Sequence, residues 1–131
     1  MIIVIIIILN NGKRELLEEA RSLVNNDVSR RALDNLAQIY ALLEHYGVAE
    51  HVVFDLGVFR NFSYYTGMVF EAYGPQIGFN ICGGGRYDGL VEEVGGKPTP
   101  ALGFGLGLDR ILMAMNEMGA DFGNDAKCEV Y

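Results

Sequence analysis

Two glycine-rich stretches of this chain each deliver an arginine where an expected strand gives way to an expected helix. The first runs over residues 83–85 and ends at Arg86, and the second alternates glycine with large apolar residues over 103–107 before Arg110. Glycine lets a backbone approach a ligand closely, and a guanidinium is a strong partner for a carboxylate or phosphate. Together the two stretches predict a pocket for a small anionic molecule.

The alternating glycines of the second stretch clear one face of a strand. Gly103, Gly105 and Gly107 share that face because side chains alternate along a strand. Arg110 then opens the next helix, whose N-terminal N–H groups also favour an anion. We expect a nucleotide or other phosphorylated ligand to lie across this floor. The opposite face, which we expect to pack on helices, carries Leu102, Phe104, Leu106 and Leu108.

A third segment, residues 59–67, supplies Arg60 and the adjacent pair Tyr64 and Tyr65. On a regular strand the two tyrosines would point to opposite faces, so only one would enter a given pocket unless the strand bulges. Arg60 is either a surface residue or is held inward by Asp55 or Glu71. These alternatives remain open from the sequence.

The glycines before Arg86 also have two interpretations. They do not form a P-loop, because no Gly-Lys-Ser/Thr follows, and their spacing does not match the dinucleotide fingerprint. Consecutive glycines leave room above a sheet, which with Arg86 and Asp88 suits a polar small molecule. The alternative is a glycine bulge against a closely packed helix, with Arg86 and Asp88 as a local ion pair.

Hydrophobic periodicity predicts the elements that must position these residues. Helical spacing is found over 13–25 and 30–46, with Ser29 as the expected cap of the second helix. Further elements are strands over 52–56, 64–73, 77–82 and 101–107, and helices over 86–94 and 108–118. The last helix should turn inward Leu108, Ile111, Leu112 and Met115. This order predicts an α+β fold, an antiparallel sheet flanked by helices.

Composition sets the domain organisation. At 131 residues, half of them apolar, the chain fits one domain with its own core. We expect an Ile-rich strand of uncertain origin at 1–9, a core over 10–119 and a tail over 120–131. The first segment is too short to span a bilayer and lacks the basic flank of a signal peptide.

Charge and cysteine content exclude several classes of function. A formal net charge of −7 with few clustered basic residues makes nucleic acid an unfavourable partner. Cys82 and Cys128 form no CxxC motif and have no histidine at metal spacing, so no metal site is expected. Two reduced cysteines indicate a cytoplasmic protein, and no membrane partner is expected.

Three segments together resemble the histidyl-tRNA synthetase family, specifically the C-terminal half of its class II catalytic domain. They are Phe-Arg-Asn-Phe-Ser-Tyr-Tyr-Thr-Gly-Met-Val-Phe-Glu, Gly-Gly-Arg-Tyr-Asp-Gly-Leu and Ala-Leu-Gly-Phe-Gly-Leu-Gly-Leu-Asp-Arg, in this order. The resemblance covers residues 13–118. Two kinds of protein share this domain: the synthetase, and the regulatory subunit of ATP phosphoribosyltransferase in histidine biosynthesis. The stretch 54–57, the Phe-Ser before Tyr64 and the third glycine before Arg86 favour the regulatory subunit.

The resemblance implies roles for particular residues. Arg60 matches an arginine that approaches the substrate carboxylate and the ATP α-phosphate. The other implied histidine-binding residues are Tyr64, Tyr65, Gly83, Gly84 and Gly85. Arg110 matches the arginine that meets the ATP γ-phosphate, with Gly105 and Gly107 beside it. No residue is assigned a catalytic role.

The resemblance also implies partners. As a regulatory subunit the chain would bind histidine, contact a separate catalytic subunit, form a homo-oligomer at full length and need no cofactor, with allosteric regulation as its role. As a synthetase it would use ATP and magnesium. Counterparts of the first two class II motifs and of an anticodon-binding domain are not found, so the chain resembles a fragment, and amino-acid activation by it alone is not expected.

Overall fold

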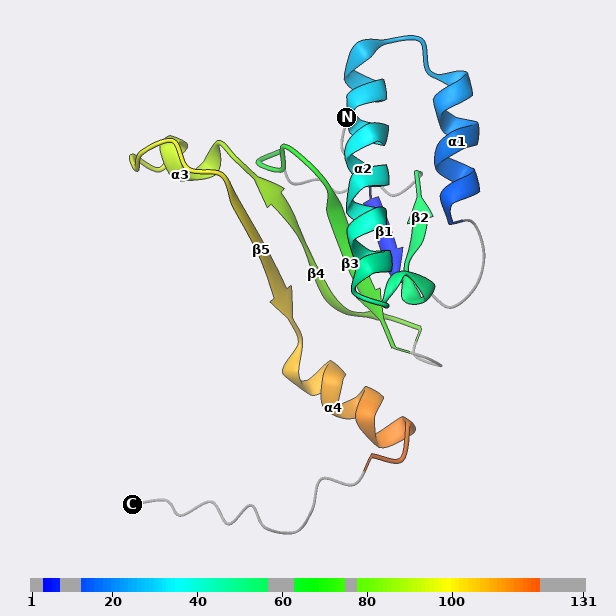
Figure 1. Cartoon of the computed structure of the whole chain (residues 1–131). Coiled ribbons are helices and arrows are strands. Elements are labelled where there is room, and N and C mark those ends of the chain that lie inside the picture. The colour runs from blue at the N-terminus through cyan, green and yellow to red at the C-terminus, as the bar shows by residue number, and fades with distance from the viewer. Residues whose placement is uncertain (1–3, 8–12, 57–62, 75–77, 121–131) are drawn as a thin grey trace.

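The computed structural model describes residues 4–7, 13–56, 63–74 and 78–120. Within these ranges five strands form one sheet in the order β2-β1-β3-β4-β5, with two long helices packed beside it (Figure 1). The strands are β1 (Val4–Ile7), β2 (Val53–Asp55), β3 (Val69–Tyr73), β4 (Asn80–Tyr87) and β5 (Ala101–Leu106). The helices are α1 (Arg14–Leu23), α2 (Asp27–His45), the short 3₁₀ helix η1 (Ala49–His51), α3 (Leu90–Glu93) and α4 (Leu108–Glu117).

The predicted α+β class is confirmed, and the sheet is antiparallel across its β3, β4 and β5 strands. β1 adds one parallel pairing, with β3, and an antiparallel pairing with β2. Residues Val4–Ile7 therefore form an inner strand with a neighbour on each side. Ile and Val have a high propensity for strands, which agrees with this placement.

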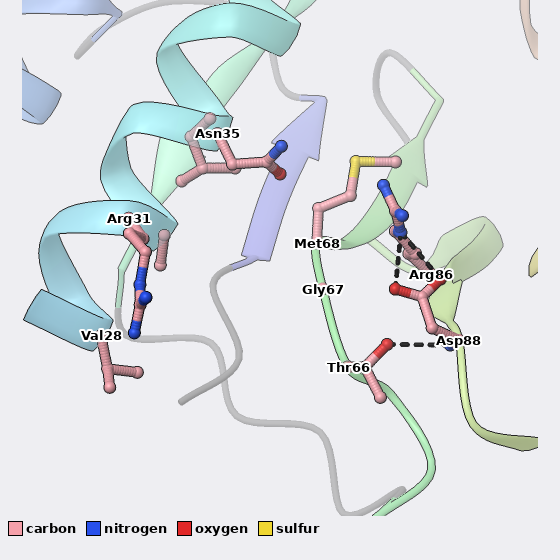
Figure 2. A pocket seen from close by; sticks show the side chains of 10 residues that line it. Val28, Arg31, Asn35, Thr66, Gly67, Met68, Arg86 and Asp88 are labelled. Carbon is pink, nitrogen blue, oxygen red and sulfur yellow. Dashed lines mark hydrogen bonds and ion pairs between the residues drawn. The ribbon is translucent and has the colours of Figure 1, made fainter. Parts of the chain in front are cut away.

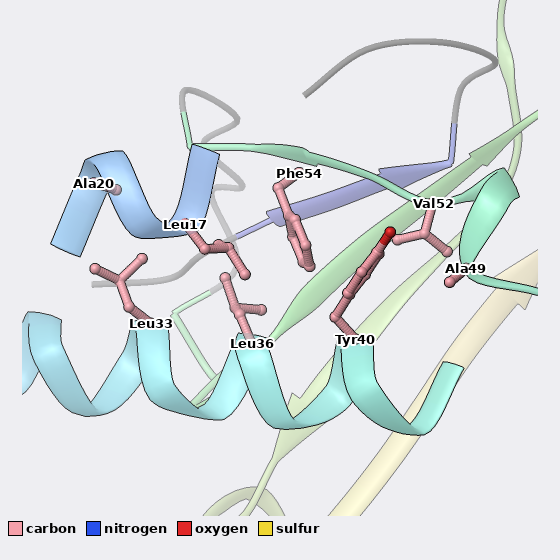
Figure 3. Packing of buried hydrophobic residues seen from close by; sticks show 8 residues of the cluster. All are labelled: Leu17, Ala20, Leu33, Leu36, Tyr40, Ala49, Val52 and Phe54. Atoms are coloured by element: carbon pink, nitrogen blue, oxygen red, sulfur yellow. The ribbon is translucent and has the colours of Figure 1, made fainter. Parts of the chain in front are cut away.

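The core lies between α1, α2 and the β2 side of the sheet (Figure 3). Leu36 of α2 is only 1% exposed, and the ring of Tyr40 stands 5.5 Å from that of Phe54. An ion pair between Arg21 and Asp34 joins the two helices at their surface. The buried cluster consists of Leu17, Ala20, Leu33, Leu36, Tyr40, Ala49, Val52 and Phe54.

The second helix begins earlier than predicted. The side chain of Asn26 accepts a hydrogen bond from the backbone N–H of Ser29 at 2.8 Å, so Asn26 is the cap and α2 starts at Asp27. The assignment of Ser29 as cap was wrong, and Ser29 is buried inside the first turn. An Asn at the cap accepts from the N–H three residues later, which satisfies a free helical donor.

The middle strands also differ from prediction. β3 begins at Val69, so Tyr64 and Tyr65 precede the strand rather than belonging to it. β4 continues through its three glycines to Tyr87, where the sequence predicted a helix from residue 86. Glycine disfavours strands intrinsically, but here every glycine of β4 pairs with a strand on each side, and this tertiary pairing outweighs propensity.

The apolar face of β5 does not pack on helices, which corrects another expectation. Phe104 is 63% exposed and Leu108, at the start of α4, is 71% exposed. Figure 1 shows why: α1 and α2 lie over the β1, β2 and β3 side, whereas α4 leads away from the sheet. The other exposed apolar residues of this region include Leu102, Leu106, Leu112 and Met115, and only Ala114 of α4 is buried.

None of the helices in the described ranges has both the length and the apolar character required to cross a bilayer.

Replacing Leu36 by alanine should lower the free energy of unfolding by about 2–5 kcal/mol, because a fully buried leucine leaves a cavity. Leu42→Ala in the same helix is the matched control, since Leu42 is 61% exposed and should change stability by less than about 0.5 kcal/mol. Urea unfolding followed by circular dichroism measures both. Equal losses for the two variants would contradict the described position of the core.

Candidate functional site

Four glycines meet on one face of the sheet because of the register between β4 and β5. Gly83 pairs with Gly105, and Gly85 pairs with Gly103. Paired residues in an antiparallel ladder point to the same face, so these positions form a patch without side chains, here called the glycine square. In the same rows of β3, Val69 lies beside Gly85 and Glu71 lies beside Gly83. The predicted bare floor is therefore present.

Backbone hydrogen bonds fasten the segment before β3 to the end of β4. The N–H groups of Thr66 and Gly67 donate to the carbonyl oxygen of Arg86 at 2.9 and 3.3 Å, and the N–H of Arg86 donates to Met68 at 2.9 Å. The hydroxyl of Thr66 accepts from the N–H of Asp88 at 2.9 Å. These bonds fix where the two preceding tyrosines can lie.

Three tyrosines form a cluster over one half of the glycine square. The rings of Tyr64 and Tyr65 are 4.5 Å apart, and Tyr87 lies 5.8 Å from the first and 6.4 Å from the second. Because Tyr64 and Tyr65 precede the strand, strand alternation does not separate them, and both join the cluster. Tyr65 approaches the space where a Cβ of Gly85 would be, and the Tyr87 hydroxyl does the same at Gly103.

Within the described residues, the space over Gly105 in the other half of the square is open. A Cβ built on Gly105 would meet no described atom within 4 Å. A hollow of about 330 Å³ opens there, lined by Gly83, Gly105, Gly107 and Arg110 among others. Two residues along a strand span roughly 7 Å, so the tyrosine cluster and this hollow are separated by about the length of a small metabolite.

Asn80, the first residue of β4, holds Arg110 at the hollow. The Nη1 of Arg110 donates to the backbone oxygen of Asn80 at 2.7 Å and to the side-chain oxygen of Asn80 at 2.6 Å. Its guanidinium also lies 5.4 Å from the centre of the Phe79 ring. These contacts use one terminal nitrogen, and the remaining donors are exposed for an anionic group.

The structure does not bring all the predicted arginines together. Arg86 projects to the opposite face of the sheet from its neighbour Gly85, and its Nε donates to both oxygens of Asp88 at 2.9 and 3.1 Å. The local ion pair considered from the sequence is therefore present. Arg60 lies outside the described residues, so its predicted place in the pocket is not tested.

Three residues outside the predicted set of site residues also contribute to the site. Tyr87 completes the aromatic cluster, Asn80 positions Arg110, and Glu71 places a carboxylate beside the open half of the square. The Glu71 carboxylate accepts a hydrogen bond from the hydroxyl of Tyr73. Alternation along the expected strand already placed Glu71 on this face, whereas Tyr87 and Asn80 depended on how far β4 extends.

Cys82 lies beside the hollow but carries no reactive signature. Burial raises the pKa of its thiol, which lowers the fraction of nucleophilic thiolate near neutral pH. In the described ranges, no three His, Cys, Asp or Glu side chains gather closely enough to hold a metal ion.

Comparison with known proteins identifies the family of the chain. The family model described as Histidyl-tRNA synthetase matches residues 3–111, which include β1 and all the described site residues. The chain belongs to the histidyl-tRNA synthetase family. The match spans the glycine square, the tyrosine cluster and Arg110 in a single alignment, as the three sequence motifs indicated.

Relatives of this family carry two names. The chain is 46% identical over 110 residues to an ATP phosphoribosyltransferase regulatory subunit of Halothermothrix orenii, covering 84% of the chain and 26% of that protein. It is 44% identical over 108 residues to a histidine–tRNA ligase of Methanocaldococcus jannaschii, covering 82% and 25%. The chain thus spans about a quarter of the length of these relatives.

A solved structure shows the same fold. The crystal structure of an ATP phosphoribosyltransferase regulatory subunit/histidyl-tRNA synthetase from Bacillus halodurans superposes with a TM-score of 0.74 at 40% identity, covering 80% of this chain and 27% of that one. The chain therefore shares the fold of this part of that structure.

Substitutions at two glycines should separate the covered and open halves of the square. In Gly85→Ala the new Cβ would lie 2.6 Å from the Met68 carbonyl oxygen and 2.9 Å from the Tyr65 ring. We expect a loss of about 1–3 kcal/mol in unfolding free energy. Gly105→Ala meets no such contact and should change stability by less than about 0.5 kcal/mol. Thermal unfolding of both variants is the measurement, and a large loss in Gly105→Ala would show that this half is closed.

Proposed function

We propose that this chain is part of a regulatory subunit of ATP phosphoribosyltransferase and that the whole subunit binds histidine on the glycine square. The observation that carries the proposal is the tyrosine cluster beside bare backbone, in a chain 46% identical to a protein of that name. Aromatic rings pack well against an imidazole, and exposed backbone lets a small amino acid approach the sheet closely.

Each part of the site has a separate role in this proposal. Tyr64 and Tyr65 contact the imidazole ring, with residues 83–85 forming the floor. The carboxylate of Glu71, beside Gly83 in the sheet, accepts a hydrogen bond from an imidazole N–H. Arg60 binds the carboxylate of histidine. These assignments give the carboxylate and one imidazole nitrogen of histidine a partner of suitable chemistry.

The open hollow accepts a second, phosphorylated group. Gly105 and Gly107 allow close approach of a nucleotide, and the free donors of Arg110 bind its phosphate. In a regulatory subunit the nucleotide bound in the hollow need not react, since no residue is assigned to catalysis.

Regulation follows from binding only under one condition. Histidine must bind two states of the complex with different affinity, and the difference passes to a separate catalytic subunit. The proposed partner is therefore the catalytic subunit of ATP phosphoribosyltransferase, in a cytoplasmic assembly that also contains further copies of the regulatory subunit.

A second candidate is a histidyl-tRNA synthetase core. The 44% identity to a histidine–tRNA ligase favours it. In that case ATP would lie over the hollow with its phosphates toward Arg110, magnesium would accompany those phosphates, and the site would activate histidine for transfer to tRNA.

Two assays distinguish the candidates. The protein encoded by the whole reading frame is mixed with the catalytic subunit of ATP phosphoribosyltransferase from the same genome. Co-elution on gel filtration, with phosphoribosyl transfer inhibited by histidine, is the expected result. Histidine-dependent exchange between ATP and pyrophosphate by the protein alone would instead support the synthetase.

Calorimetric titration tests the 131-residue chain by itself. We expect it to bind histidine weakly or not at all, because it spans only about a quarter of the length of its relatives. Tight binding that depends on Arg60 would contradict this expectation.

Arg110→Ala should leave the fold intact and weaken ATP binding about tenfold, because a charge-assisted contact to phosphate is lost. Its hydrogen bonds to Asn80 are exposed, so the unfolding midpoint should remain near that of the parent. Arg30→Ala, an exposed change on α2, is the matched control for net charge. Calorimetric titration with ATP measures the affinity, and unfolding of Arg110→Ala would show that the residue is structural.

A further inference from the structure

A second cavity lies on the face of the sheet opposite the glycine square. It has a volume of about 360 Å³ and opens between α2 and the segment that leads into β3 (Figure 2). Arg86 reaches it because its side chain alternates with that of Gly85, and Ala32 and Leu36 of α2 form its other wall. This cavity is therefore separate from the proposed histidine site.

Two arginines from different elements line this cavity. Arg31 comes from α2, and within the described ranges its guanidinium has no hydrogen bond or ion pair. Arg86 comes from β4 and uses only its Nε on Asp88. Figure 2 shows the terminal nitrogens of Arg86 pointing away from Asp88, with Arg31 across the gap. Both arginines thus retain donors for a further partner.

The charge of the cavity contrasts with that of the chain. The lining contains two guanidinium groups and one carboxylate, that of Asp88, so it carries excess positive charge although the net charge of the whole chain is −7. Two hydrogen bonds hold Asp88 in place: its N–H donates to the hydroxyl of Thr66, and its carboxylate accepts from the Nε of Arg86. An acidic chain that retains a positive cavity favours an anionic ligand there.

The donors in the lining favour phosphate over carboxylate. Arg31 and Arg86 come from opposite walls, and a phosphate offers more acceptor oxygens to guanidinium and amide donors than a carboxylate does. Asn35 adds an amide on the α2 wall, and Val28 and Met68 supply apolar surface for the body of a ligand. The volume lies in the range of small-molecule sites.

We propose that this cavity binds a small phosphorylated molecule through Arg31 and Arg86. The proposal is independent of histidine binding, since the two sites lie on opposite faces of the sheet. A ligand here would join α2 to the end of β4, two elements that approach each other across the cavity.

Nuclear magnetic resonance titration of the 131-residue chain with inorganic phosphate, at constant ionic strength, tests the proposal. Saturable shifts are expected at the amides of Asn35, Gly67 and Asp88. Arg31→Gln should weaken binding about tenfold, and Arg30→Gln, one residue away and outside the cavity, should leave it unchanged. Arg86→Lys, which keeps the charge but loses the planar donor fork, should also weaken it.

Several results would overturn the assignment. Equal weakening by Arg30→Gln would mean that phosphate only screens charge. Shifts centred on Gly105 and Arg110 would place the phosphate at the other site. Acetate binding as tightly as phosphate would show a carboxylate site instead. If Arg31→Gln fails to fold, Arg86→Lys carries the same test.

Discussion

The register of β4 between β3 and β5 is the constraint on which the site depends. It places Gly83 opposite Gly105 and Gly85 opposite Gly103, so the bare backbone of two strands coincides on one face. A slip of one residue would turn every side chain to the other face, and Phe104 would then stand where the floor now lies. Since glycine contributes no side-chain packing, this register is maintained by backbone pairing along both edges of β4.

Arg86 links the two faces of the sheet. Its backbone carbonyl accepts from Thr66 and Gly67 and so holds the tyrosine segment over the glycine square, while its side chain lies in the cavity beneath α2. A movement of β4 at this residue would therefore affect both sites. The ion pair with Asp88 keeps the side chain in one orientation, although an exposed pair of this kind adds little stability.

Burial is unevenly distributed over the sheet. The buried cluster lies against α1 and α2, whereas the apolar residues of β5 and α4 are exposed in the described chain. The open half of the glycine square belongs to this less buried side. Stability is not uniform within a domain, and elements with few buried apolar contacts open first. A binding surface on such elements can adapt to its ligand at small cost.

The sequence by itself determined the element types, the class of fold and the family. The α1 and α2 helices follow from helical periodicity, and β5 and its bare face follow from alternating glycines, because these signals are local. Only the tertiary structure decided where β3 and β4 begin and end, and that Tyr64 and Tyr65 share one cluster. It also decided that Arg86 and Arg110 lie at opposite ends of β4 and on opposite faces of the sheet. Pairing partners set those outcomes: glycines with weak strand propensity became a strand only because β3 and β5 flank them. The exposed apolar face of β5 likewise depends on how far α2 reaches across the sheet, and no local pattern encodes that distance.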